Sequence, residues 1–174
     1  MAKRKGSHAH YEIMFEDFLR ENNILYIAVD ETRRPVIDGG SVKNFDFIVS
    51  SFNGKYLVDI KGKDFSSRTW DNWVHESDLT GLKIWGNHFN AFIPLLVIPY
   101  LITNTKDIQV LQPYADIRKF KGKTYGIIGV TLADYYSRAK IRSKKFTAIY
   151  VSRQDFLEIC KPLSHFIPEF KKNW

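Results

Sequence analysis

The sequence predicts an α/β protein in which helices flank a mixed central sheet. Amphipathic helical segments alternate with strand-like segments, Asn53-Gly54 separates two strand-like runs as a hairpin turn would, and one later strand is apolar throughout. Such alternation is typical of a sheet covered by helices. The 174 residues suit one core, so we expect a single domain over residues 1–174.

The first predicted element is an amphipathic helix at residues 9–22. Apolar side chains recur at helical spacing, and Tyr11, Phe15 and Phe18 share one face. Turn residues and apolar periodicity divide the rest of the chain. We expect strands at 24–29, 92–102, 108–111, 124–131 and 146–152, a hairpin over 43–64, and helices at 79–89 (with Asp78 as N-cap), 132–142 and 153–160.

The charge balance favours an anionic partner. Lysine and arginine number 26 against 19 aspartates and glutamates, and the formal net charge is +7. Nucleic acid is the first partner that such an excess suggests.

The sequence indicates neither a membrane protein nor a disulfide-bonded one. Cys160 is the single cysteine and lies in an apolar helical pattern, where a small core residue is expected. The longest apolar run, 92–102, contains two prolines and is too short to span a bilayer. Residues 1–8 form a basic arm without the apolar stretch of a secretory signal. We therefore expect a cytoplasmic, intracellular protein without membrane association.

Three charged residues interrupt the strands of the hairpin: Asp46, Asp59 and Lys61. If Asn53-Gly54 forms a two-residue turn, Asp46 pairs with Lys61. Because side chains alternate along a strand, all three charges then lie on one face of the sheet. The opposite face is apolar and consists of Phe47, Val49, Val58 and Ile60.

These charges have two interpretations. Asp46 and Lys61 can form a cross-strand ion pair on a solvated face, which is worth less than about 1 kcal/mol. Alternatively, two carboxylates at the diagonal spacing of about 7–8 Å share a divalent cation. Helices on both faces would bury the charges, and unpaired buried charge is costly, so we favour a functional site.

The helix at 9–22 offers a further carboxylate. Glu12 and Glu16 lie on the shoulder of its buried face, from which a side chain can reach over the sheet edge. Glu12 is closer to the core boundary and is our first choice, with Glu16 as the alternative.

A helical glutamate, Asp46 on one strand and Asp59-Ile60-Lys61 on the next resemble the PD-(D/E)xK nuclease superfamily. The run HYEIMFE at 10–16 also resembles the HYExxFE pattern of uncharacterised bacterial proteins assigned to that superfamily. Phe45 stands where the name-giving proline would be. The resemblance covers roughly residues 9–103 and implies a restriction-endonuclease-like αβββαβ core in a protein of bacterial origin.

The resemblance implies metal-dependent hydrolysis of phosphodiester bonds in DNA. Asp46 and Asp59 would hold Mg²⁺ (or Mn²⁺), with the carbonyl of Ile60 as a further ligand. Lys61 would position the attacking water or neutralise charge on the transition state. Glu12, or Glu16 in its place, would complete the metal shell.

Basic and aromatic residues around these elements are candidates for contact with the nucleic acid. The candidate basic residues are Arg33, Arg34, Lys63, Arg68, Arg142 and Lys145. Trp70 and Trp73 follow Lys61 in an irregular stretch. They can stack on an unpaired base or, as we expect, hold a loop against the core.

Two alternatives to a nuclease remain. The chain can be a catalytically silent module of nuclease-like fold that binds nucleic acid or a protein partner, or a basic α/β protein with an unrelated ligand. Clustered carboxylates favour the enzyme, because beside a phosphate they need a cation. A homodimer is possible, because symmetric cutting of both strands of a duplex needs two active sites.

Overall fold

The computed structural model of the chain describes residues 9–169, and the predicted basic arm at 1–8 lies outside them. The helices are α1 (Ala9–Glu21), α2 (Glu76–His88), α3 (Lys106–Leu111), α4 (Leu132–Arg138), α5 (Arg153–Ile159) and α6 (Leu163–Phe166). The strands are β1 (Leu25–Ala28), β2 (Val36–Ile37), β3 (Gly40–Ser41), β4 (Phe47–Ser51), β5 (Gly54–Ile60), β6 (Lys63–Asp64), β7 (Val74–His75), β8 (Ile93–Ile102), β9 (Asp116–Phe120), β10 (Lys123–Thr131), β11 (Ala139–Ser143), β12 (Ala148–Val151) and β13 (Lys161–Pro162).

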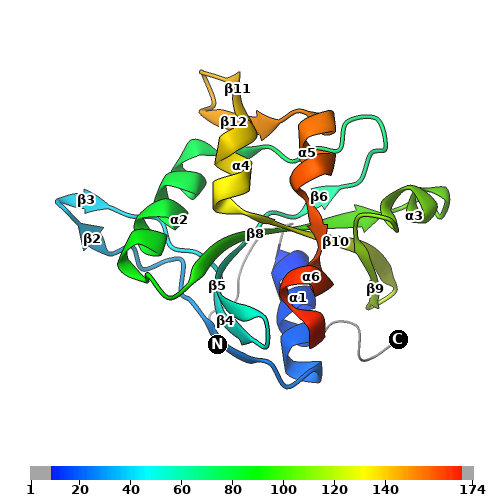
Figure 1. Cartoon of the computed structure of the whole chain (residues 1–174), viewed down its shortest axis with the longest axis horizontal. Coiled ribbons are helices and arrows are strands. Elements are labelled where there is room, and N and C mark those ends of the chain that lie inside the picture. The colour runs from blue at the N-terminus through cyan, green and yellow to red at the C-terminus, as the bar shows by residue number, and fades with distance from the viewer. Residues whose placement is uncertain (1–8, 170–174) are drawn as a thin grey trace.

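One mixed sheet organises the described part of the chain (Figure 1). Its strands follow the order β1-β4-β5-β8-β10-β13, while β6 also pairs with β8 and β9 with β10. Strand β4 is antiparallel to β1 and to β5, whereas β5 and β8 are parallel and are joined through α2. A parallel pair requires such a crossover. The prediction of an α/β protein with a mixed sheet flanked by helices is confirmed.

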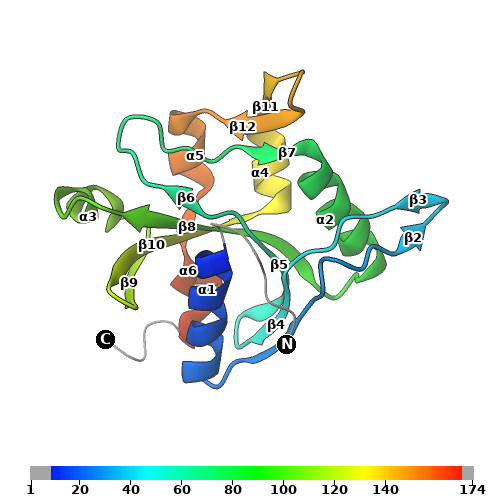
Figure 2. The ribbon, with the colours of Figure 1, turned by 180° about the vertical axis from the view of Figure 1, so that it is seen from behind.

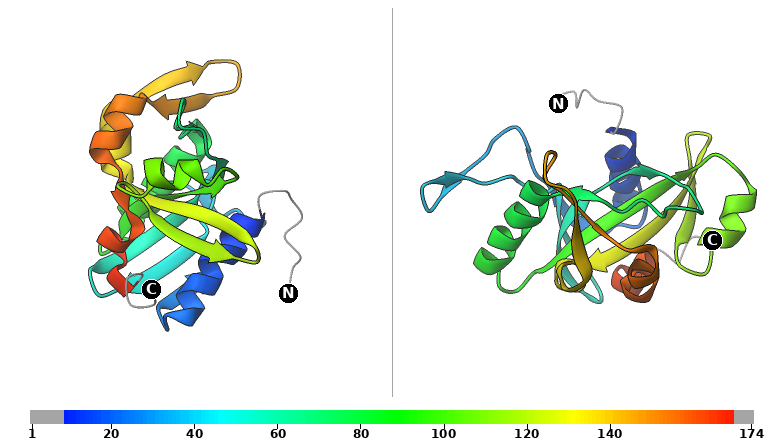
Figure 3. Two further views of the ribbon diagram at one scale, coloured as in Figure 1. Left: turned by 90° about the vertical axis from the view of Figure 1, so that its right-hand side faces the viewer. Right: turned by 90° about the horizontal axis from the view of Figure 1, so that it is seen from above.

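Helices cover both faces of the curled sheet (Figures 2 and 3). Helices α1 and α6 pack on one face, in a core cluster that contains Phe15, Phe47 and Phe166. Helices α2, α4 and α5 pack on the other face, around Leu79 and Tyr135. Two smaller units flank this body: the β2–β3 hairpin, and a three-stranded sheet of order β11-β12-β7.

Two predicted elements are wrong. Residues 108–111, expected as a strand, belong to helix α3, where Oδ1 of Asn104 accepts a hydrogen bond from the amide of Lys106. Side-chain bonds of this kind start turns and compete with strand formation. Residues 139–142, expected as the end of a helix, belong to β11, which pairs with β12. Pairing with another segment outweighs local helix propensity there.

The register of the β4–β5 hairpin also differs from the prediction, by two residues. Phe47 pairs with Val58 and Ser51 pairs with Gly54, so the turn consists of Phe52 and Asn53. Because side chains alternate with a period of two, a shift of two residues leaves each side chain on its predicted face. The apolar face is confirmed: Phe47, Val49, Val58 and Ile60 all belong to the cluster under α1.

Contacts from the far end of the chain explain this register. The Glu169 carboxylate accepts hydrogen bonds from the amide of Phe52 and the hydroxyl of Ser51. The carbonyl of His165 accepts one from the side chain of Asn53. These partners lie 112 to 118 residues away in the sequence, so local turn propensity contains no trace of them.

Candidate active site

A pocket of about 410 Å³ opens where the first turn of α1, the end of β5 and the first turn of α2 meet. Carboxylates outnumber lysines in its lining. The carboxylates are Glu12, Glu31, Asp46, Asp64 and Asp78, and the lysines are Lys43, Lys61 and Lys63. An acidic excess of this kind attracts a cation.

Three carboxylates converge on one side of this pocket. Glu12 lies in the first turn of α1, Glu31 in the loop after β1, and Asp46 directly before β4. Each offers a carboxylate oxygen, and these oxygens lie within 4.8 Å of one another. The backbone joins the last two segments, because the amide of Val29 donates to the carbonyl of Asp46 at 2.8 Å. We call Glu12, Glu31 and Asp46 the carboxylate triad.

Asp46 is the most buried member of the carboxylate triad, with 2% of its surface exposed. Its Oδ2 accepts a hydrogen bond from the amide of Ile60 at 2.6 Å, which fixes the side chain against the end of β5. Burial, then the negative charge of Asp59 and contact with Glu31, raise the pKa of Asp46 well above its usual range. A cation bound there would favour the ionised carboxylate and so lower this pKa.

Asp59 and Lys61 belong to a second group of charges beside the carboxylate triad. Nζ of Lys61 lies 2.9 Å from Oδ2 of Asp59 and 3.3 Å from Oδ2 of Asp78, and Lys43 also bonds to Asp78. All four side chains are largely buried. Oδ2 of Asp59 is buried and makes this short contact with the ammonium group of Lys61.

The electrostatics of this group keep Lys61 charged. Burial opposes its charge, but the carboxylates of Asp59 and Asp78 outweigh burial and raise the pKa of Lys61. Burial pushes the pKa of Asp78 upward, yet Lys61 and Lys43 outweigh it and lower that pKa below the usual value. Burial raises the pKa of Asp59, an effect that Lys61 opposes and Asp78 reinforces. Lys61 is therefore an ammonium group held by two carboxylates.

Two glycines allow the site's elements to approach closely. A Cβ on Gly62 would overlap the ring of Tyr11, so only glycine lets the end of β5 lie against the first turn of α1, beside Glu12. A Cβ on Gly81 would lie 2.7 Å from the carbonyl oxygen of Lys43, so glycine also brings α2 against the segment that carries Lys43. The glycines help set the position of the charged groups.

The structure brings most of the predicted site residues together. Glu12, Asp46, Ile60 and Lys61 line the pocket, and Asp59 contacts Lys61 at its edge. Asp59 is not part of the carboxylate triad.

Glu16, the alternative to Glu12, lies away from the carboxylate triad. Its Oε1 forms an ion pair with Arg20 at 2.9 Å and accepts a hydrogen bond from the hydroxyl of Tyr26 at 3.0 Å. One helical turn separates Glu12 from Glu16, and only Glu12 reaches the pocket.

Three residues of the carboxylate triad and of the group around Lys61 are absent from the sequence-based prediction: Glu31, Lys43 and Asp78. Asp78 was expected to cap a helix, but α2 begins earlier, at Glu76, and turns Asp78 inward. Glu31 sits in a polar loop with no periodicity to single it out. One usable signal for Lys43 was its place shortly before Asp46, at the start of the hairpin.

The donor set fits a hard divalent cation. The carboxylate triad supplies oxygen ligands, Asp59 is a further buried carboxylate beside Lys61, and Ile60 lines the pocket. Mg²⁺ and Mn²⁺ prefer carboxylate and carbonyl oxygens.

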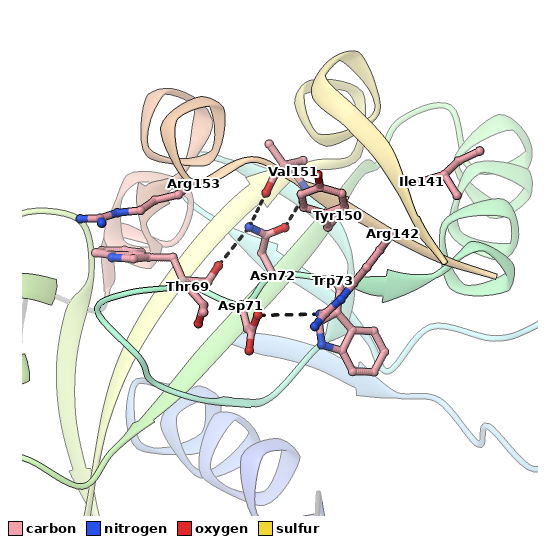
Figure 4. Close-up of a pocket in the computed structure, with 10 residues that line it drawn as sticks. Thr69, Asp71, Asn72, Trp73, Ile141, Arg142, Tyr150, Val151 and Arg153 are labelled. Carbon is pink, nitrogen blue, oxygen red and sulfur yellow. Dashed lines mark hydrogen bonds and ion pairs between the residues drawn. The ribbon is translucent and has the colours of Figure 1, made fainter. Parts of the chain in front are cut away.

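The predicted nucleic-acid contacts are dispersed around this pocket. Lys63 lines it, whereas Arg142 lines a neighbouring pocket of about 360 Å³ (Figure 4). Arg33 and Arg34 border an apolar depression beside Phe45. Arg68 and Lys145 are exposed.

The two tryptophans after Lys61 behave differently. Trp70 is fully buried and packs edge-on against Phe65 and Tyr100, so it holds the loop to the core as expected. Trp73 is partly exposed and lines both pockets. Cys160 is buried, as predicted.

Among residues 9–169, no helix is long and apolar enough to cross a membrane. No protein-family model matches this chain, and no curated protein matches it. The resemblance to PD-(D/E)xK nucleases therefore rests on the residues of the α1 and β4–β5 segments themselves.

Proposed function

We propose that this chain is a metal-dependent nuclease that hydrolyses phosphodiester bonds in DNA. The observation that carries the proposal is the position of Lys61, a charged and largely buried lysine in the same pocket as the three carboxylates of the triad. Carboxylates beside a phosphate repel it unless a cation intervenes, and a lysine beside that cation favours an anionic substrate.

The residues have distinct roles in this proposal. The carboxylate triad holds Mg²⁺ (or Mn²⁺), with Asp59 and the carbonyl of Ile60 as further oxygen donors. When bound, the cation supplies the charge that polarises a phosphate and lowers the pKa of a water molecule. Lys61 stabilises negative charge that develops on the phosphate, and Asp59 and Asp78 hold its ammonium group in place.

The order of elements supports a restriction-endonuclease-like core. Helix α1, strands β1, β4 and β5, helix α2 and strand β8 follow the αβββαβ order that the resemblance implies, apart from short inserted strands. In this sequence of elements, Glu12 comes from the first helix, and Asp46 and Asp59 lie at neighbouring ends of the β4–β5 hairpin.

One observation favours the catalytically silent alternative. Lys61 is paired with two carboxylates, and burial raises the pKa values of Asp46 and Asp59, so the site can balance its charges without a cation. Such a site can belong to a binding module.

Cleavage of supercoiled plasmid separates the two functions. Wild-type protein is incubated with Mg²⁺, Mn²⁺ or EDTA beside Asp46→Asn, Asp59→Asn and the control Glu16→Gln, and metal binding is measured in parallel by calorimetry. We expect nicking that requires metal, disappears in both aspartate variants and persists in Glu16→Gln. DNA binding without cleavage under any metal condition would favour the silent module.

A further inference from the structure

A second pocket lies beside the candidate active site and shares Trp73 with it (Figure 4). Its volume is about 360 Å³, within the range of small-ligand pockets. The loop before β7 forms one side, and β11, β12 and the start of α5 form the other. Its aromatic and charged lining consists of Trp70, Asp71, Trp73, Arg142, Tyr150 and Arg153.

The loop that carries Trp73 is rigidly attached. The side-chain amide of Asn72 donates to the carbonyls of Trp70 and Val151, and its Oδ1 accepts from the amide of Val151 at 2.8 Å. The hydroxyl of Tyr135 donates to the carbonyl of Asn72 at 2.8 Å. Trp70 adopts a left-handed conformation with φ of 47°, which is costly for a non-glycine residue and persists only where packing imposes it. The aromatic wall is therefore preformed.

Two cationic side chains lie over the ring of Trp73. Nζ of Lys63 lies 3.5 Å from the centroid of its ring, and the Arg142 guanidinium lies 5.4 Å from it. Arg142 is held by Asp71 at 3.8 Å, as Figure 4 shows. Arg153 is exposed and forms no ion pair among residues 9–169. Lys63 belongs to the first pocket, Arg142 and Arg153 to the second.

We propose that this second pocket binds an unpaired nucleotide next to the scissile phosphate, with its base against Trp73 and its phosphates at Arg142 and Arg153. The inference rests on the proposed function, because the adjoining pocket is taken to hold the scissile phosphate. Trp73 links the two pockets, and the basic side chains continue from Lys63 into the second. Aromatic surfaces with neighbouring cations bind single strands, whereas a paired base is not free to enter a pocket. The substrate is therefore DNA with a single-stranded segment.

Binding without cleavage tests this site. A short single-stranded oligonucleotide that contains 2-aminopurine is titrated with protein in EDTA, beside a blunt duplex of the same length. Fluorescence quenching reports stacking of the base, and anisotropy reports affinity. The variants are Trp73→Leu, Trp73→Phe and Arg153→Ala. The control is Lys106→Ala, an exposed lysine on α3, outside both pockets.

We expect wild-type protein to prefer the single strand and to quench the base. Trp73→Leu should lose the quenching and about tenfold in affinity, Trp73→Phe should retain part of both, and Lys106→Ala should match wild type. Arg153→Ala should lower affinity with quenching retained, which provides a test even if Trp73→Leu misfolds.

Variants that bind the single strand as tightly as wild type would overturn the inference and leave the nuclease proposal intact. Equal affinity of wild-type protein for the single strand and the duplex would also overturn the inference and leave the nuclease proposal intact. If wild-type protein binds neither the single strand nor the duplex, both this inference and the proposal that DNA is the substrate are contradicted. Binding as expected without cleavage in Mg²⁺ would overturn only the nuclease proposal.

Discussion

Nζ of Lys61 lies 3.3 Å from Oδ2 of Asp78, a residue in the first turn of α2. Lys61 follows β5, so this contact connects the strand end to the helix that begins after β7. Asp78 is almost fully buried and also bonds to Lys43. The ammonium group of Lys61 is therefore held from two sides, by Asp59 and by Asp78.

Asp78→Asn should reduce cleavage and leave metal affinity unchanged. The substitution removes a charge that positions Lys61, and it lowers the raised pKa of Lys61. We expect a loss in cleavage rate of about tenfold or more, with the alkaline limb of the pH–rate profile moved to lower pH. Asp107→Asn, on α3 and outside the pocket, is the control. An unchanged pH profile would contradict a positioning role for Asp78.

Lys61→Ala should destabilise the fold as well as abolish cleavage. It leaves the buried carboxylates of Asp59 and Asp78 close together without their shared cation. Removal of one partner from a buried ion pair costs about 3 kcal/mol. Urea unfolding of Lys61→Ala beside Lys61→Arg, which keeps the charge, measures the effect. Equal stability of the two variants would show that the ion pairs contribute nothing.

Glu12→Gln and Glu31→Gln should each weaken Mn²⁺ binding about tenfold or more, because each removes a charged ligand from the carboxylate triad. Glu16→Gln is a matched control on the same helix, since Glu16 pairs with Arg20 instead. Isothermal titration calorimetry gives the affinities. Full Mn²⁺ affinity in Glu31→Gln would remove Glu31 from the metal site.

Asp46→Asn should stabilise the metal-free protein at neutral pH. The raised pKa means that the folded protein keeps a proton that the unfolded chain releases above its ordinary pKa of 3.8. The free energy of unfolding of wild type therefore falls as the pH rises through this window, and the asparagine variant lacks this fall. We expect a gain of about 1 kcal/mol at pH 7, or about 2–4 °C in Tm. Thermal melts in EDTA at several pH values test this.

Mg²⁺ should raise the Tm of wild type but not that of Asp46→Asn, because the variant loses a charged ligand. If Asp46→Asn melts below wild type in EDTA at pH 7, the raised pKa of the Asp46 carboxyl is contradicted.

DNA affinity should fall between pH 7 and pH 9 through Lys63. Burial lowers its pKa to about 8; Asp71 opposes this shift, and Lys61 and Arg142 add to it. Loss of the Lys63 charge should reduce the slope of log affinity against log salt concentration by the contribution of about one phosphate contact. Anisotropy titrations over a range of salt at each pH give this slope. Lys63→Arg stays charged and should show a constant slope, and a similar fall in both proteins would assign the titration to another group.

Local sequence was sufficient to predict which face of the hairpin is apolar and which carries charge. Side chains alternate along a strand, so the faces of Asp46, Asp59 and Lys61 followed from parity alone, even though the predicted pairing was two residues out of register. Helical periodicity similarly placed Glu12 at the border of the buried face. Both inferences depend only on neighbours within a few residues.

Which charged groups come into contact depends on tertiary packing. Glu169 and His165 hold the hairpin turn from the other end of the chain, and α2 turns Asp78 toward Lys61. Glu31, in an irregular loop, joins Glu12 and Asp46 to form the carboxylate triad. These positions depend on packing between segments far apart in the sequence, and local periodicity carries no information about that packing.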